Sequence, residues 1–276
     1  MKKKISTIAV ISVFSIIILL CVVSIVSQKI TEHKEKTEFE KLAEIVTEET
    51  TNTDTETETI RKPSLLKVSD SDDEFQTEQP VYYTTYYEPH SISELVSMNS
   101  ECFGWISISE TNINYPVMHT PSNPQKYLNK NFYGEYSYSG TPFLDARCSA
   151  DSTNLIIYGH HMNDGSMFNV ISDTTDQATF DSIEYVYYIT RDATYKLRPL
   201  ATKVVEDTYA KARTPNFDGD DGLKNYLSEM LDGASAAASD AGDRAASATK
   251  VVTLVTCRSL SLSNTRAVMV LTPVEE

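Results

Sequence analysis

The chain has 276 residues and a formal net charge of −15 at pH 7, and this length is enough for one large domain or two small ones. The acidic balance, with no basic run beyond the first few residues, argues against a nucleic-acid partner, because phosphate binding needs clustered Lys and Arg. The four cysteines are too few and too widely spaced for a disulfide scaffold, and no Cys-x-x-Cys pair indicates a zinc site.

The N-terminus places three lysines before an uncharged apolar run over residues 5–26. A run of this length spans a bilayer core. A cleaved signal peptide is the alternative, but the run exceeds a usual signal core and lacks a small-residue cleavage site after it. We predict a cytoplasmic tail at 1–4 and a single-pass signal anchor at 5–26, with the bulk of the chain outside the cell. The reverse orientation stays open, because further lysines follow the run.

Residues 27–90 are predicted to form a stalk and an acidic spacer. Phe39, Leu42 and Ile45 have near-helical spacing and indicate a short amphipathic helix that rises from the membrane. From Thr47 to Pro80 the chain is rich in Thr, Glu and Asp and poor in apolar residues, so it cannot offset the entropy of ordering. We therefore predict that this second part is disordered.

Residues 91–276 are predicted to form the folded domain. Its β-type runs, each bounded by turn residues, are GWISI, INYPVM, TPFLD, NLIIYG, EYVYYIT, ATYKLRPLATKVV, KVVTLVTC and RAVMVLT. Many short strands indicate a mainly β fold, either a barrel or a sandwich. Residues 221–248 interrupt the strands with a helical pattern, whose second half, around Gly233 and Gly242, is expected to be frayed or looped.

Cys257 and His160 each close an apolar strand and precede a polar loop, which is where a barrel exposes side chains to a cleft. Cys257 has Arg258 beside it, and a β-hairpin would bring Arg266 back to it. A cysteine, a histidine and an arginine suit acyl transfer, with thiolate attack, proton shuttling and oxyanion stabilisation. The alternative for Cys257 is a buried core residue.

His161 follows His160 directly, and the pair could be taken for a metal site. Neighbouring residues on a strand face opposite ways, however, and no carboxylate at ligand spacing supports metal binding. We predict no metal and no organic cofactor.

The sequence TLVTC at 253–257 resembles the TLxTC signature of the sortase family, and Arg266 follows nine positions later. The block NLIIYGHHM resembles the histidine block of class B sortases, and FGWISISETNINYPVM resembles the first strands of that class. The resemblance covers most of residues 91–276. It implies a closed sortase-type β-barrel of about eight strands, with an N-terminal helix and a helix inserted before the cysteine strand.

The resemblance further implies a cysteine transpeptidase. Cys257 is then the nucleophile, His160 the general acid/base, and Arg266 the group that steadies the oxyanion or the substrate. Leu254 and Thr256 belong to the same motif, with strand packing as an equal alternative to substrate contact. Tyr158 and Asn112 are further candidates for the peptide groove.

The expected partners are surface proteins with a C-terminal sorting motif of the LPxTG kind, and the membrane. The acyl group would pass to an amine of a cell-wall peptide in a Gram-positive envelope, with a pilin lysine as the alternative acceptor. From another functional class, a non-catalytic, membrane-tethered β-domain that binds an envelope ligand also fits, as does a cysteine hydrolase. Whether Cys102 and Cys148 pair as a disulfide stays open.

Overall fold

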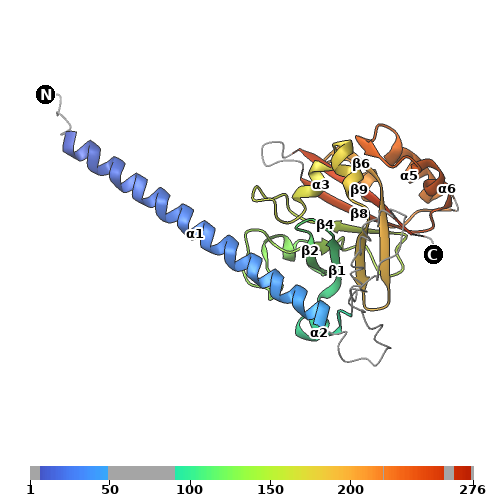
Figure 1. Cartoon of the computed structure of the whole chain (residues 1–276), viewed down its shortest axis with the longest axis horizontal. Coiled ribbons are helices and arrows are strands. Elements are labelled where there is room, and N and C mark those ends of the chain that lie inside the picture. Colours follow the sequence, from blue (N-terminus) through green and yellow to red (C-terminus); the bar gives the residue numbers. More distant parts are fainter. Residues whose placement is uncertain (1–6, 49–90, 220, 258–263, 275–276) are drawn as a thin grey trace, which may run out of the picture.

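The computed structural model describes residues 7–48, 91–219, 221–257 and 264–274. The predicted disordered spacer therefore lies almost wholly outside the described residues, as do residues 1–6. Within the described parts, a long N-terminal helix meets a β-barrel that carries short helices on its outside (Figure 1).

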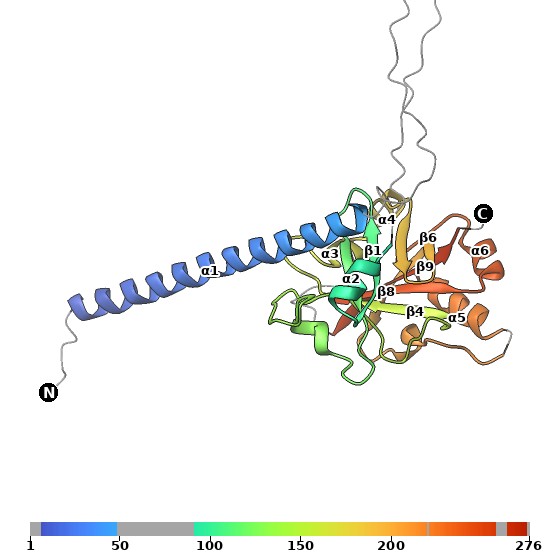
Figure 2. The same ribbon diagram turned by 90° about the horizontal axis from the view of Figure 1, so that it is seen from below.

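Helix α1 (Thr7–Glu48) joins the predicted membrane span and the predicted stalk helix into one continuous element. Its first half projects away from the barrel in both views (Figure 1, Figure 2). The large apolar side chains from Val13 to Val26 are exposed there. The apolar part of the helix has a mean hydropathy of 2.4, is not buried, and is long enough to cross a membrane. The N-terminal helix thus fits a membrane anchor.

The second half of α1 packs against the barrel. Phe39, Leu42 and Val46 recur at helical spacing and are buried at 6%, 0% and 2% exposure. The Phe39 ring meets the Tyr115 ring edge-on at 5.0 Å between centroids. The hydrophobic core therefore includes the end of α1 as well as residues from the domain that we placed at 91–276.

Nine strands make up the described sheet, and all eight predicted runs are among them. They are β1 (Cys102–Ile108), β2 (Asn114–Met118), β3 (Phe143–Leu144), β4 (Asn154–Tyr158), β5 (Val186–Thr190), β6 (Thr194–Glu206), β7 (Ala236–Ala237), β8 (Val251–Cys257) and β9 (Thr265–Pro273). Their order is β5-β1-β2-β3-β4-β8-β9-β6-β7, and β5 also pairs with β6. That last pairing closes a barrel of eight strands, with β7 added outside the ring, as the class B sortase resemblance predicts.

Short helices cover the outside of the barrel and fill its loops. They are α2 (Ser93–Met98), η2 (Lys126–Asn129), α3 (Asn169–Asp173), α4 (Gln177–Ser182), η3 (Ala210–Arg213), α5 (Gly222–Leu231) and α6 (Ala241–Ser247). The predicted helix before the cysteine strand is α5. It ends at Leu231, and Gly233, two residues further on, has a φ of 66°, the left-handed conformation typical of a residue just past a helix end. Beyond it, β7 and α6 replace the frayed or looped stretch that we expected.

Strand β8 lies at the centre of the architecture, between β4 and β9. It runs parallel to β4 and antiparallel to β9. All its residues from Val251 to Thr256 are buried, because strands of the barrel flank it and α3 packs against it. This burial explains the nearly continuous apolar run in the sequence.

Candidate active site

Strand register brings the three predicted catalytic positions to one level of the barrel. In the parallel pair β4 and β8, Tyr158 lies beside Val255. The backbone N–H of Gly159 extends this ladder by donating to the Val255 carbonyl at 3.1 Å. His160 and Cys257 each follow two residues after the Tyr158–Val255 pair, and Cys257 is the register partner of Arg266 on β9. The backbone positions of all three therefore lie on adjacent chain segments at one end of the sheet.

His160 is half-buried, and its tautomer is set by a backbone carbonyl. Its Nε2 atom lies 2.7 Å from the oxygen of Leu128, in the η2 segment. A carbonyl oxygen only accepts, so Nε2 carries the proton and Nδ1 keeps the lone pair. Nδ1 is then the nitrogen that can accept a proton during chemistry.

Gly159 lets the loop after β4 pack closely against the barrel. A Cβ atom at this position would lie 2.5 Å from the Phe168 ring, well inside van der Waals contact. Phe168 is itself buried, and its backbone N–H donates to the His160 carbonyl at 2.8 Å. Close approach, rather than a sharp turn, is thus the reason for glycine before the histidine.

Arg266 is the second residue of β9, and its side chain is 26% exposed. Its Nη1 atom donates to the Thr265 carbonyl at 3.1 Å, and its Nη2 atom lies 3.9 Å from the Asp207 carboxylate. These contacts restrain a cation at the level of Cys257.

A cavity of ≈ 500 Å³ opens at this end of the barrel. Its wall includes His160, Thr256, Arg266 and Tyr158, together with η2 and the end of η3. The volume is in the range of small-molecule and peptide side-chain sites. The predicted histidine and arginine therefore share one open space, whereas the side chain of Cys257 lies outside the described residues.

Three charged residues that sequence reasoning missed line the same cavity: Asp145, Arg147 and Arg213. Asp145 is 7% exposed and accepts two hydrogen bonds from the Arg147 guanidinium, at 2.9 and 2.8 Å. The Tyr158 hydroxyl also donates to Asp145, at 2.8 Å. The only signal in the sequence was the polar pair that follows the strand TPFL, and it indicates no partner by itself.

The pKa values in this cluster follow from burial and pairing. Burial alone raises the pKa of Asp145, but the hydrogen bonds from Arg147 and Tyr158 together hold it below its usual range. Burial, and then the adjacent Asp145 charge, raise the pKa of the Tyr158 hydroxyl. At neutral pH the cluster is therefore a carboxylate, a guanidinium and a neutral phenol.

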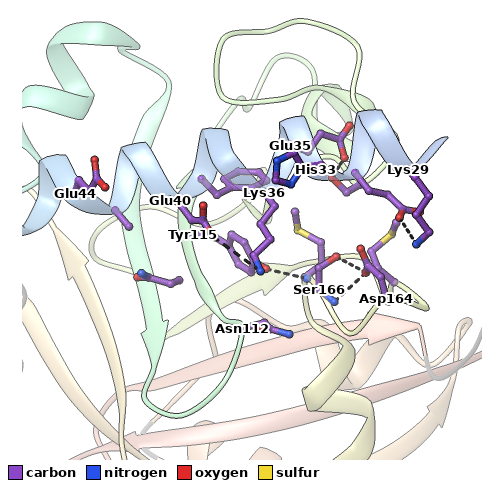
Figure 3. Close-up of a pocket in the computed structure, with 17 residues that line it drawn as sticks. Lys29, His33, Glu35, Lys36, Glu40, Glu44, Asn112, Tyr115, Asp164 and Ser166 are labelled. Carbon is purple, nitrogen blue, oxygen red and sulfur yellow. Dashed lines mark hydrogen bonds and ion pairs between the residues drawn. The ribbon is translucent and has the colours of Figure 1, made fainter. Parts of the chain in front are cut away.

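The other predicted substrate-binding residues occupy different environments. Leu254 is fully buried in the core, which supports its packing role. Thr256 is 2% exposed, and its Oγ1 atom has no hydrogen-bond partner among the described residues. Asn112 lies away from His160, in a second cavity of ≈ 560 Å³ beneath α1 (Figure 3). Its side chain donates to the Gly165 carbonyl at 3.0 Å there.

Cys102 and Cys148 are free, buried thiols, so the structure contains no bond between them. Burial raises their pKa values to about 12 and about 11 respectively, which makes them poor nucleophiles. His161 faces away from the cavity toward α3, where its Nε2 lies 3.2 Å from the Asn169 amide nitrogen. No group of three His, Cys, Asp or Glu side chains among the described residues is arranged to hold a metal ion.

Comparisons with known proteins agree on one family. No protein-family model matches the chain. Sortase B of Staphylococcus aureus is 30% identical over 139 residues, which cover 49% of this chain and 55% of that protein. Sortase B of Listeria monocytogenes is 38% identical over 79 residues, or 28% of this chain and 32% of that protein. The matched segments thus span about half, and about a third, of these relatives.

The fold gives the same result over a longer stretch. The structure of the Staphylococcus aureus sortase B–substrate complex superposes with a TM-score of 0.59 and 26% identity, and the match covers 67% of this chain and 84% of that one. The mainly β architecture, with its closed eight-stranded barrel and N-terminal helix, is that of sortase B.

Proposed function

We propose that this chain, which belongs to the class B sortases by sequence and by fold, is a membrane-anchored cysteine transpeptidase. It cleaves an LPxTG-like sorting motif after Thr and transfers the acyl group to an amine of a cell-wall peptide. The observation that carries this proposal is the common level of His160, Cys257 and Arg266 at a cavity large enough for peptide side chains.

In the first half-reaction Nδ1 of His160 takes the proton of the Cys257 thiol, the sulfur attacks the threonine carbonyl carbon, and the carbonyl oxygen becomes an oxyanion. Arg266 is the cation placed to stabilise that charge, because it is the register partner of Cys257 and lines the cavity. As the C–N bond breaks, the leaving amine takes a proton from Nδ1 of His160, and a thioester remains.

In the second half-reaction an acceptor amine attacks the thioester. His160 Nδ1 accepts the proton that this amine loses, while Nε2 stays bonded to the Leu128 carbonyl. The sulfur leaves, and a new amide bond forms. The Leu128 contact keeps the imidazole in one orientation through both steps, which supports a shuttle by a single nitrogen.

The anchor helix supports a role at the membrane surface. Since α1 runs without a break from its apolar part into the barrel, it holds the barrel near the bilayer. Substrates tethered to the membrane and lipid-linked acceptors would meet the enzyme there. We propose a single-pass topology with the catalytic domain outside the cell.

Product analysis tests this function. The full-length chain in detergent is incubated with LPxTG-like and NPxTN-like peptides, with and without an amine, beside Cys257→Ala. Amine-dependent amide products from the wild type alone support a transpeptidase, and a preference for a lysine side chain as acceptor would favour pilin polymerisation. Hydrolysis that the amine never diverts indicates a hydrolase, and no product at all favours the non-catalytic binding domain.

A further inference from the structure

The active-site cavity has the opposite charge to the chain as a whole. Among the described residues, three arginines line it, Arg147, Arg213 and Arg266, against the single carboxylate of Asp145. The cavity therefore holds an excess of positive charge in a chain whose formal net charge is −15. A concave site with charge of one sign attracts ligand groups of the other sign.

The cations differ in how far the chain neutralises them. Arg147 forms a two-point pair with Asp145, and Arg266 has the Asp207 carboxylate at 3.9 Å. Arg213 lines the cavity and has no carboxylate within ion-pair distance among the described residues. It is therefore the uncompensated cation of the described cavity wall.

Backbone contacts hold Arg213 in place without using its charge. Its Nη2 atom donates to the Asp207 carbonyl at 2.6 Å, and its own carbonyl accepts from Arg147 Nη2 at 2.8 Å. Arg147 and Arg213 are thus linked through the main chain. Both also act electrostatically on the Tyr158 hydroxyl, where each lowers the pKa against the larger effect of burial.

Contacts with β4 give the distance of the Asp145–Arg147 pair from the reacting centre. Asp145 donates its backbone N–H to the Ile156 carbonyl, and its carboxylate accepts from Tyr158. Tyr158 and Ile156 precede His160 by two and four residues, which correspond to about 7 and 13 Å of extended chain. An extended peptide that reacts at the level of His160 covers this distance in about two to four residues.

We propose that Arg213, supported by Arg147, forms a carboxylate-binding subsite, and that this enzyme prefers a sorting peptide with an acidic side chain two to four residues from the scissile bond. The inference rests on the proposed function and adds the chemical class of its substrate. Because a guanidinium binds a carboxylate through two parallel N–H donors, the subsite distinguishes Glu from its amide analogue Gln.

The test compares peptides that differ only by Glu or Gln. One residue is varied at each position two to four residues on either side of the scissile bond, and kcat/KM is measured with the full-length chain in detergent. At the preferred position we expect Glu to exceed Gln by about 10- to 100-fold, the range for a hydrogen bond to a charged group. Arg213→Gln removes this preference and Arg213→Lys restores part of it.

Lys211→Gln is the matched control. Lys211 lies in the same η3 segment, pairs with Glu229, and does not line the cavity. The Lys211→Gln substitution removes one positive charge, as Arg213→Gln does, and should leave the Glu preference intact. Equal loss in both variants would mean that net charge, and not a subsite, sets the preference, which overturns the proposal.

Binding of the same peptides to Cys257→Ala keeps the test independent of turnover. Glu-selective binding that depends on Arg213 supports the subsite even if no peptide reacts, in which case the proposed transpeptidase fails alone. Reaction without any Glu-over-Gln difference leaves the transpeptidase standing and overturns the subsite. A uniform loss of both peptides in Arg213→Gln overturns it too, since Arg213 would then bind peptide backbone.

Discussion

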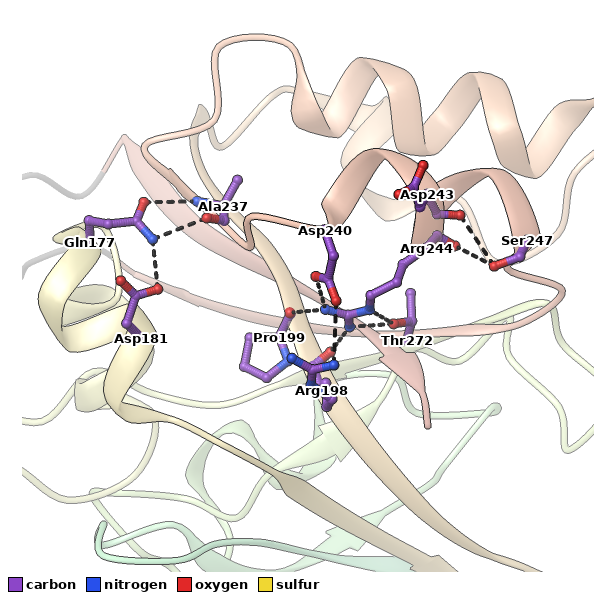
Figure 4. A network of polar contacts seen from close by, with 10 residues as sticks. All are labelled: Gln177, Asp181, Arg198, Pro199, Ala237, Asp240, Asp243, Arg244, Ser247 and Thr272. Carbon is purple, nitrogen blue, oxygen red and sulfur yellow. Dashed lines mark hydrogen bonds and ion pairs between the residues drawn. The ribbon is translucent and has the colours of Figure 1, made fainter. Parts of the chain in front are cut away.

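Strand β9 has an arginine site at each end, and the two sites use the same side chain differently. At its start, Arg266 lines the open cavity with Arg213 and Arg147. At its end, Thr272 accepts hydrogen bonds from Arg244 of α6 (Figure 4). The other Arg244 donors go to the carbonyls of Pro199 and Arg198 and to the Asp240 carboxylate.

The difference lies in where the donors are directed. Every nitrogen of the Arg244 guanidinium donates to the chain itself, and its side chain is only 16% exposed. Burial is the main cause of its lowered pKa. Arg213, in contrast, donates one hydrogen bond, to the Asp207 carbonyl, and lines a cavity. An arginine whose donors are all bonded to the chain, such as Arg244, holds neighbouring elements together. An arginine with unused donors that face a cavity, such as Arg213, is available to a substrate.

The largest effect should come from His160→Gln at the cavity end. Loss of the proton shuttle is expected to lower the single-turnover rate by about 10²- to 10⁴-fold. The thermal midpoint should change little, since the only hydrogen bond of the His160 side chain among the described residues is the one to the Leu128 carbonyl. Rapid-quench measurement of acyl transfer checks the rate. A variant that keeps more than a tenth of the wild-type rate would remove His160 from the mechanism.

Arg266→Gln is expected to have the second-largest effect. Its kcat should fall by about 10²- to 10³-fold, as for loss of an oxyanion donor. Arg198→Gln is its control at the other end, because Arg198 forms a partly exposed pair with Asp240 and lies outside the cavity. Steady-state kinetics with a fluorogenic peptide compare the two. Similar rates for both variants would mean that the guanidinium of Arg266 does not stabilise the transition state.

Arg244→Ala, unlike the two preceding substitutions, should lower the stability of the fold and leave the reaction rate unchanged. The substitution removes the Arg244 hydrogen bonds to the Arg198 and Pro199 carbonyls and to the Thr272 hydroxyl, which we expect to cost about 2–3 kcal/mol of unfolding free energy. Urea denaturation measures the loss, and kcat per folded molecule should stay at the wild-type value. An unchanged unfolding midpoint would show that this network contributes nothing to the barrel.

Asp145→Asn should produce the smallest effect, and one that depends on pH. The folded-state pKa of Asp145 is lowered, so its ionised form adds stability above the unfolded pKa of about 3.9, and this stability is lost as pH falls through the folded value. We expect the variant to be about 1 kcal/mol less stable at pH 7. The difference should shrink as the pH approaches 3. A constant difference across this range would mean that the ionised carboxylate is not what stabilises the cluster.

Much of the barrel could be predicted because its strands are short, β-branched and separated by turn residues. All eight predicted runs are strands, and α5 lies where a helix was expected. Strand β7 was missed because two alanines carry no periodicity. The docking of α1 was also missed, although the spacing of Phe39 and Leu42 indicated an apolar face; the sequence does not say against what such a face packs.

The site could be predicted in part. His160 and Cys257 each end an apolar run, and the family resemblance pairs them. That they lie at the same level of the barrel follows from the register of the parallel strands β4 and β8, which the sequence alone does not give. The Arg147 side chain donates to the Arg213 carbonyl, which lies 66 residues further along the sequence. Contacts of that separation leave no local pattern, so the charge of the cavity was visible only in three dimensions.

If Cys257 is the nucleophile, it forms a thioester with a sorting peptide, and intact-mass spectrometry of the full-length chain detects that thioester. After mixing with an LPxTG-like peptide in the absence of an amine, we expect an adduct of the acyl fragment, located at Cys257 by proteolysis and released by hydroxylamine. Cys257→Ala should give none. An unmodified chain, with a Cys257 thiol that also resists iodoacetamide in the folded protein, would rule out Cys257 as the nucleophile.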